Sequence, residues 1–383
     1  MSKQYQEISV LQVLPALNTG GVERGTIDIA AALSRNNIRS FIASSGGKLV
    51  KKLPLLKTEH FCISTLKNKS PFTIITNAFR LARIIKKHKI KIIHARSRVP
   101  AWSAYLASKM TGCKFVTTFH GTYNINFPKC LKRKYNSVMT KGEKVIAVSN
   151  FIKDHMGQNY QIDPKKVTVI HRGVDLEIFA DSKVPGQRLI DMKNKMPIPD
   201  DKFVIVMPGR VTPWKGQKVM LEALKKLNRQ DVCCLIVGDI KQKPKYYREL
   251  QHLIKEYKLE NQVVFTGDIA DMPTIYKLSD LVVVSSIEPE AFGRIPIEAQ
   301  AMGKIVIASN IGGFKETIKN GKTGFLFEAG DSNTLSKLML EAIKFPLKVK
   351  KQIKQDAINN AHNFSLEKMQ DQTLKLYRRL ASG

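Results

Sequence analysis

Short runs of apolar, β-branched residues alternate with stretches of helical spacing along almost the whole of this 383-residue chain. One series of such runs begins at Ile8 and continues to residue 180, and a second begins at Phe203 and continues to residue 364. Runs of this kind are typical of strands buried on both faces of a parallel sheet. A chain of this length exceeds what one hydrophobic core usually holds. The alternation therefore predicts an α/β protein with two doubly wound, Rossmann-like domains that face a cleft.

The segment between the two series, residues 181–201, is rich in charge and proline and has no sustained period. We therefore predict that it is the linker between domains at residues 1–180 and 202–364. Residues 365–383 have the pattern of an amphipathic helix. This final helix can cap either domain, which includes packing back on the first one.

The formal net charge is +31, and residues 51–150 hold 21 basic residues against 2 acidic ones. Such a field favours an anionic partner, which can be a nucleic acid, an anionic membrane surface or a phosphorylated substrate. A lysine-rich, solvated surface without a partner is the alternative explanation. We expect no nucleic-acid partner, because the chain has no recognisable reading module and no interleaved aromatic and basic pattern.

Two predicted helices combine apolar and basic residues. The first, residues 71–89, has an apolar stripe between lysines and arginines; the stripe consists of Phe72, Ile75, Phe79, Ala82 and Ile85. The second, residues 127–139, is apolar on one side and strongly basic on the other. Helices of this kind can dip into an anionic headgroup layer, or they can pack against the sheet.

The five cysteines have no Cys-x-x-Cys spacing, and we expect reduced, buried thiols rather than a metal site. We expect no export signal, and the chain has no run of eighteen apolar residues. We therefore expect a cytoplasmic protein, with attachment to the inner face of the cytoplasmic membrane as an option. The oligomeric state stays open.

The stretch from Ser285 to Gly303 carries two carboxylates, Glu290 and Glu298, after the all-apolar run Leu281–Val284. The run predicts a buried strand, which puts Glu290 in the loop at its carboxyl end and Glu298 on the next helix. Open α/β sheets bind their ligands at this edge. Amides of the helix start favour an anionic group, and carboxylates accept hydrogen bonds from hydroxyls. A nucleotide sugar has both features.

Three further motifs follow predicted strands. Gly20 and Gly21 form a glycine turn before a helix, a weak phosphate-binding signal by itself. Arg210 and Lys215 lie between a strand end and a helix start, where they can neutralise two adjacent phosphates. His120 closes a strand of the first domain.

Together these motifs resemble the GT-B fold glycosyltransferases, and more narrowly the retaining group of family 4 (glycosyl transferases group 1), over nearly the whole chain. The resemblance implies a GT-B fold and an enzyme of the hexosyltransferase type. It implies catalytic roles for Arg210 and Lys215 on the leaving diphosphate, for Glu290 on the sugar hydroxyls and for His120 near the reacting carbon. Residues implied in donor binding are Gly21, Ala291, Phe292, Gly293 and Glu298.

By the same resemblance, the substrates are a nucleotide-diphosphate sugar and a glycan or lipid-linked acceptor of cell-envelope polysaccharide or lipopolysaccharide biosynthesis. No metal and no other cofactor is required, because arginine, lysine and helix amides replace the metal. A sugar-nucleotide epimerase or a phosphorylase of the same fold remains an alternative, as does a basic nucleic-acid-binding protein. The chain departs from the family pattern at Arg172, where relatives often have asparagine. This arginine adds a cation that points to an acidic substrate or is merely solvated.

Overall fold

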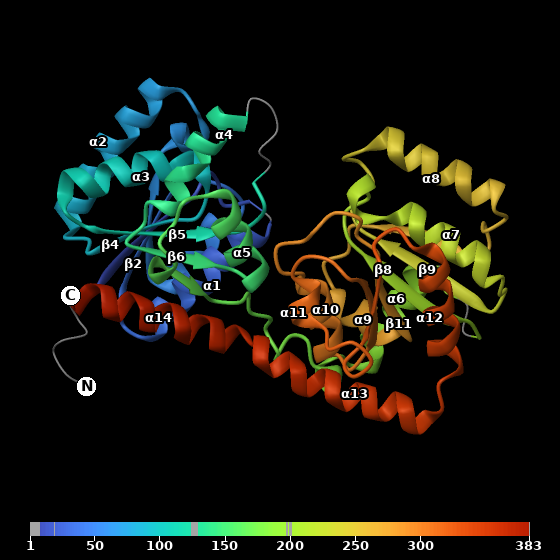
Figure 1. Ribbon diagram of the computed structural model, residues 1–383. Helices are drawn as coiled ribbons and strands as arrows, with labels where there is room; N and C mark the ends of the chain where they lie inside the picture. The colour runs from blue at the N-terminus through green and yellow to red at the C-terminus, as the bar shows by residue number, and fades with distance from the viewer. Residues whose placement is uncertain (1–7, 19, 124–128, 197, 199–200, 383) are drawn as a thin grey trace. The chain divides into compact units, whose positions relative to one another are not determined.

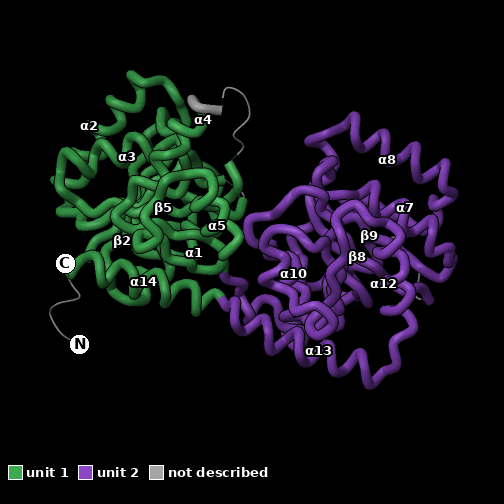
Figure 2. Tube along the Cα trace, in the orientation of Figure 1, with its two compact units in different colours: residues 1–172, 366–383 green, residues 173–365 purple. Residues whose placement is uncertain are grey.

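The computed structural model describes residues 8–18, 20–123, 129–196, 198 and 201–382. The chain forms two compact units, which are coloured separately in Figure 2. Unit 1 contains residues 1–172 and 366–383, and unit 2 contains residues 173–365. Both units are parallel α/β structures, which confirms the predicted fold class.

Unit 1 is built on a seven-stranded parallel sheet in the order β3-β2-β1-β4-β5-β6-β7. Its chain order reverses between β1 and β4, which is the switch point where doubly wound sheets bind ligands. The strands are β1 Ser9–Val13, β2 Arg39–Ser44, β3 Thr58–Cys62, β4 Ile92–Ala95, β5 Lys114–Phe119, β6 Lys144–Ala147 and β7 Val167–Val169.

Helices cover both faces of this sheet. Figure 1 shows α1 and α14 on one face and α2 and α3 on the other. The α1 and α14 side is an apolar core in which Leu33 and Leu374 contact strand residues such as Val10 and Ile92. The helices of unit 1 are α1 Gly21–Arg35, α2 Pro71–His88, α3 Arg98–Thr111, α4 Lys129–Asn136, α5 Asn150–Asn159 and α14 Leu366–Ser382.

Unit 2 is built on a six-stranded parallel sheet in the order β10-β9-β8-β11-β12-β13. Its central strands are rich in valine and isoleucine and are buried on both faces, as a parallel sheet requires. The strands are β8 Phe203–Pro208, β9 Val232–Val237, β10 Val263–Gly267, β11 Leu281–Val284, β12 Ile305–Ser309 and β13 Phe325–Phe327.

Successive side chains of these strands enter two separate cores. Ile205 and Cys234 contact the core that α7, α8 and α12 cover, and Val206 and Cys233 contact the core beside α6 and α9. The adjacent cysteines therefore point to opposite faces, and both are free thiols. The helices of unit 2 are α6 Gly186–Lys195, α7 Gln217–Leu227, α8 Pro244–Glu256, α9 Met272–Leu278, α10 Arg294–Ala301, α11 Phe314–Thr317, α12 Ser332–Lys344 and α13 Leu347–Ala361.

The boundaries between the units differ from the predicted linker. The chain passes from unit 1 to unit 2 at Arg172 and returns after Ser365. The described residues of the segment 181–201 belong to unit 2 and include α6, Gly186–Lys195. Met192 and Ile198 of this segment pack against the core beside β8 and β9, so its few apolar residues have a structural role despite the charged composition.

The apolar stripe predicted along α2 is divided in the structure. Ala82 and Ile85 are buried, whereas Phe72, Ile75 and Phe79 are exposed. Because one turn contains 3.6 residues, a stripe of residues spaced three or four apart shifts gradually around the helix axis. Its first residues therefore face away from the unit, and its last ones face the core. The second predicted amphipathic helix begins outside the described residues, at residues 127 and 128, and continues as α4. Within the described part of the chain, no helix has both the length and the apolar content to cross a bilayer.

Candidate active site

Two loops of unit 2 meet at the carboxyl ends of adjacent strands. One loop joins β8 to α7 and carries Arg210 and Lys215; the other joins β11 to α10 and carries Glu290. β8 and β11 are neighbours in the sheet, and the chain order reverses between them. The two loops therefore lie at the ligand-binding switch point of this sheet.

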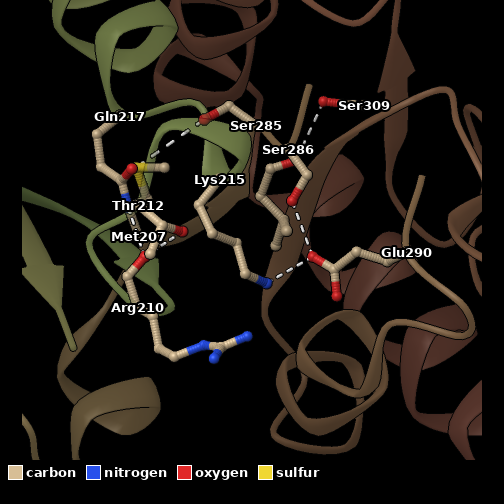
Figure 3. Close-up of polar contacts among 10 residues, drawn as sticks. Met207, Arg210, Thr212, Lys215, Gln217, Ser285, Ser286, Glu290 and Ser309 are labelled. Atoms are coloured by element: carbon tan, nitrogen blue, oxygen red, sulfur yellow. Dashed lines mark hydrogen bonds and ion pairs between the residues drawn. The ribbon is translucent and has the colours of Figure 1, made fainter. Parts of the chain in front are cut away.

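Lys215 and Glu290 form a closely paired, largely buried ion pair (Figure 3). Lys215 Nζ lies 2.6 Å from Glu290 Oε1, and the two side chains are 9% and 16% exposed. Ser286 Oγ donates a hydrogen bond of 2.8 Å to the same carboxylate oxygen. Among the described residues, Glu290 Oε2 has no partner and points away from both donors in Figure 3. One carboxylate oxygen is thus held rigidly while the other is available to a substrate hydroxyl.

Hydrogen bonds join the two loops near this pair. The Ile287 amide donates to the Trp214 carbonyl at 2.9 Å, and Ser285 Oγ donates to the Gly216 carbonyl at 3.0 Å. Gly216 has φ +76°, and a Cβ at this position would lie 1.8 Å from the Ser285 carbonyl oxygen. Only glycine permits this close approach, so Gly216 fixes the position of Lys215 relative to the Glu290 loop.

The ring of Trp214 lies close to both cations of the first loop. Lys215 Nζ lies 4.5 Å from the centre of the Trp214 ring, and the Arg210 guanidinium carbon lies 5.7 Å from it. Arg210 is exposed, and Gln217 Nε2 donates to its carbonyl oxygen at 3.0 Å. The indole face therefore keeps two positive charges together, and both can act on a diphosphate.

The predicted donor-binding residues 291–293 lead into α10. Gly293 is the N-cap of this helix at φ +81°, and the Phe292 ring is buried against Phe364 with 5.6 Å between the ring centres. The Gly313 amide donates to the Glu290 carbonyl at 2.8 Å, which fixes the turn before the helix. The chain at Ala291 therefore enters a helix whose first amides have no partner within the helix.

Glu298 is buried, with 8% of its surface exposed, and it lies in a network of side chains. Tyr276 donates to Glu298 Oε2 at 3.2 Å, and Arg294 lies 3.4 Å from Oε1. Burial and the adjacent carboxylate raise the pKa of Tyr276 well above its usual value. Glu298 is therefore an oriented carboxylate rather than a solvated one, and its predicted ribose contact stays a prediction.

In unit 1, Gly21 is the first residue of α1, and Arg172 lies across the first turn of this helix. Arg172 Nη1 donates to the Gly21 carbonyl at 2.8 Å. A Cβ on Gly25 would lie 2.5 Å from the same nitrogen, so the guanidinium occupies the space that a side chain would take. The buried Arg96 contacts Gly25 from another side, donating to its carbonyl oxygen at 3.3 Å.

His120 follows β5 at the carboxyl edge of the unit 1 sheet. Both ring nitrogens are buried and have no hydrogen-bond partner among the described residues. Burial, and after it the positive charges of Arg172 and Arg96, hold the pKa of His120 well below its usual value. The ring is therefore neutral at neutral pH and has hydrogen-bonding capacity that a substrate can use.

The structure therefore brings Arg210, Lys215 and Glu290 together in unit 2, while Gly21 and His120 both lie at the carboxyl edge of the unit 1 sheet. Trp214, Ser286 and Tyr276 were not singled out from the sequence, because the role of each depends on a side-chain contact that only the folded structure shows. Trp214 could have been noticed as an aromatic residue beside the predicted phosphate-binding lysine.

Comparisons with known proteins agree with the fold. The sequence profile of the family described as glycosyl transferases group 1 matches residues 190–361, which include the unit 2 site. The profile of glycosyltransferase family 4 matches residues 19–178, which include Gly21 and His120.

Several known proteins are similar to this chain over most of its length. A glycosyltransferase from Rickettsia africae ESF-5 is 43% identical, with a TM-score of 0.92 and coverage of 98% of this chain and 99% of that one. The UDP complex of Alr3699/HepE from Anabaena is 24% identical, with a TM-score of 0.83 and coverage of 96% and 99%.

Among curated proteins, the Escherichia coli enzyme UDP-Gal:alpha-D-GlcNAc-diphosphoundecaprenol alpha-1,3-galactosyltransferase is 28% identical over 342 residues, which are 85% of this chain and 84% of that protein. These matches confirm the resemblance on which the site residues were assigned, and they confirm that the protein is an enzyme. The chain belongs to family 4 of the glycosyltransferases, with the GT-B fold.

Proposed function

We propose that this enzyme transfers a hexose-type sugar from a uridine diphosphate donor to a lipid-linked glycan, with retention of the anomeric configuration and without a metal. The proposal places the reaction at the cytoplasmic face of the membrane, in the synthesis of a cell-envelope polysaccharide or lipopolysaccharide. The name of the Escherichia coli relative, which includes UDP-Gal and a diphosphoundecaprenol acceptor, supports the donor and acceptor classes.

The observation that carries the proposal is the buried pair of Lys215 and Glu290 with Arg210 beside it. Lys215 uses one ammonium hydrogen on Glu290 and has two others to donate. Breaking the bond between the sugar and the diphosphate leaves negative charge on the phosphate oxygen. Preorganised cations at that oxygen stabilise the charge as it develops and so lower the barrier. Glu290 Oε2 meanwhile accepts a hydrogen bond from a sugar hydroxyl, which orients the reacting carbon.

The proposed transfer balances without a further reactant. The bond from the anomeric carbon to the donor phosphate oxygen breaks, and a bond from that carbon to the acceptor oxygen forms on the same face of the sugar. The departing phosphate oxygen takes the proton of the acceptor hydroxyl. Arg210 and Lys215 supply the positive charge that a divalent cation supplies in metal-dependent transferases.

A donor screen tests this function. We expect uridine diphosphate sugars to raise the melting temperature of the wild-type protein, because binding to the folded state stabilises it. The Lys215→Met variant should lose this shift, and its kcat should fall about 10²-fold to 10³-fold. Because this variant leaves Glu290 buried without its partner, the double variant Lys215→Met, Glu290→Gln serves as a second test in a neutral background.

A matched control is available on the neighbouring helix. Lys218 Nζ lies 2.6 Å from Glu249 Oε1, the same distance as in the site, but both side chains are about half exposed. Lys218→Met should change kcat less than twofold, because an exposed pair contributes little. The absence of a melting shift with every nucleotide sugar, or unchanged transfer by Lys215→Met, would contradict the proposal. Conversion of the donor without any acceptor would instead favour an epimerase.

A further inference from the structure

The outward face of α2 in unit 1 carries an unusual set of exposed apolar side chains. Phe72, Ile75 and Phe79 are 79%, 49% and 61% exposed. The opposite face of the same helix holds it to unit 1 through the buried residues Ala78 and Leu81. The three side chains therefore lie largely outside the core, where exposed apolar area lowers the solubility of the protein.

The same face becomes cationic in the second half of the helix. Arg83 and Lys86 continue the stripe of Phe72 and Phe79, because residues three or four apart share one face. Both cations are exposed, Arg80 and Lys87 lie along one side of the stripe, and α2 contains no acidic residue. The outward face thus combines an apolar half with a strongly basic half.

The topology of unit 1 determines which half lies near the predicted site residues of this unit. The α2 helix follows β3, whose carboxyl end lies at the same edge of the parallel sheet as His120 and Gly21. The chain then runs back along α2 toward the start of β4. Phe72 and Ile75 therefore lie toward the carboxyl edge, and Lys86 lies toward the opposite edge. Figure 1 shows α2 beside α3 at the outside of unit 1.

We propose that this face of α2 docks on an anionic lipid bilayer, with Phe72, Ile75 and Phe79 in the headgroup region and the flanking cations on anionic headgroups. An interfacial helix needs this combination, because buried apolar area and attraction to anionic lipid add to each other. The inference rests on the proposed function in one respect: a lipid-linked acceptor would lie in that bilayer. A second copy of the chain fits the face poorly, because it would bring the same cations against one another.

Flotation with vesicles tests the docking surface. We expect the wild-type protein to float with vesicles of phosphatidylglycerol and phosphatidylcholine and to float far less with phosphatidylcholine alone. The double variant Phe72→Ser, Phe79→Ser should bind anionic vesicles more than tenfold more weakly. In Arg83→Gln, Lys86→Gln, each lost cation should weaken binding about fivefold.

Two control variants separate this surface from the general charge of the protein. Leu347→Ser removes an exposed apolar side chain, 68% exposed, from α13 of unit 2. Lys141→Gln, Lys166→Gln removes two exposed cations from unit 1 outside α2. Both should float as the wild type does.

Three results would overturn the docking surface. In the first, the wild-type protein floats with neither vesicle type. In the second, Phe72→Ser, Phe79→Ser floats as well as the wild type. In the third, Arg83→Gln, Lys86→Gln and Lys141→Gln, Lys166→Gln weaken binding equally. Sedimentation tests whether a second copy covers this face instead. That would be the case if the wild type were a dimer and Phe72→Ser, Phe79→Ser were a monomer. The melting shift with uridine diphosphate sugars should be the same in all four variants, so failure of docking and failure of the proposed function give different results.

Discussion

The arginine at position 172 shows how one departure from the family pattern is accommodated by other residues of the chain. Its guanidinium lies on the first turn of α1 and donates to the Gly21 carbonyl at 2.8 Å. This position is open only because residue 25 is glycine. Glycine inside a helix costs about 1 kcal/mol relative to alanine, so Gly25 gives up helix stability for this contact. Arg172 thus has a structural partner, and it need not be a solvated arginine.

Gly25→Ala should separate stability from activity. The new methyl group displaces the flexible end of Arg172 and improves the helix, so the melting temperature should stay the same or rise. Losing the contact at Gly21 should raise the KM for the donor about tenfold, as expected for one charged hydrogen bond, with a smaller effect on kcat. Steady-state kinetics and thermal melting measure the two effects.

Arg172→Ala serves as the comparison for this variant. It should raise KM by a similar factor, and combining it with Gly25→Ala should add little, because both changes remove the same contact. A lower melting temperature with an unchanged KM in Gly25→Ala would show that Arg172 does not position the glycine turn.

At the scale of elements, α14 is an integral part of the unit 1 core. Leu374 and Tyr377 are buried against the α1 side of the sheet. Tyr377 Oη lies 2.5 Å from Nδ1 of the fully buried His94, and Thr118 contacts the other ring nitrogen at 2.7 Å. Burial raises the pKa of Tyr377 to about 12, so the hydroxyl stays protonated.

Two substitutions in α14 should therefore destabilise unit 1. Leu374→Ala should cost about 2–5 kcal/mol of unfolding free energy, because it leaves a cavity in the core. Tyr377→Phe should cost about 1–3 kcal/mol, because it leaves one buried nitrogen of His94 without a partner. Hydrogen exchange should show faster opening of amides in β1 and β4, with the amides of unit 2 unchanged. Lys375→Ala, on the exposed side of the helix, should have no such effect.

Most elements could be predicted from the sequence, because buried parallel strands have a strong compositional signal. The run Leu281–Val284, for example, forms a strand with the predicted bounds. The helix α6 was missed because its charged sequence hides the few residues, such as Met192, that pack on the sheet. The direction of Phe72 was left open by the sequence, since the helical period alone does not tell which part of an apolar stripe faces the core.

The candidate site was predictable to a similar degree. Lys215 and Glu290 could each be placed after a predicted strand, and the strand order in the structure shows that the two strands are neighbours. Tyr276 could not be assigned, because its contact with Glu298 depends on how separate segments pack. The burial of Glu298 likewise follows from tertiary structure rather than from its place in the motif.

At the scale of the whole molecule, the groups that determine acid stability are divided between the units. Burial holds the pKa of His94 and His120 well below the usual value of 6.5, and both lie in unit 1. The described carboxyls with lowered pKa, Asp231, Asp271 and Asp331, lie in unit 2, and their usual value is 3.8. The two units should therefore respond to acid in different pH ranges.

The sign of the effect follows from where the proton binds. Below pH 6.5 the unfolded chain protonates His94 and His120, whereas the folded unit 1 keeps them neutral. The unfolding free energy of unit 1 should therefore fall as pH drops from 6.5 toward 5, because each histidine takes up its proton only when the unit unfolds. The carboxyls of unit 2 contribute stability that is lost only as pH falls below 3.8 toward their lower folded values.

Hydrogen exchange between pH 7 and pH 5, corrected for the intrinsic exchange rate, can measure both units in one experiment. We expect the opening free energy of β1, β4 and β5 amides to decrease over this range while that of β8 and β11 amides changes little. The control is Tyr377→Phe, in which His94 loses a hydrogen-bond partner but stays buried. The opening free energy of this variant should be lower at pH 7, and it should decrease with pH as steeply as in the wild type. An equal decrease in both units, or a flat profile in unit 1, would contradict the assignment of acid sensitivity to His94 and His120.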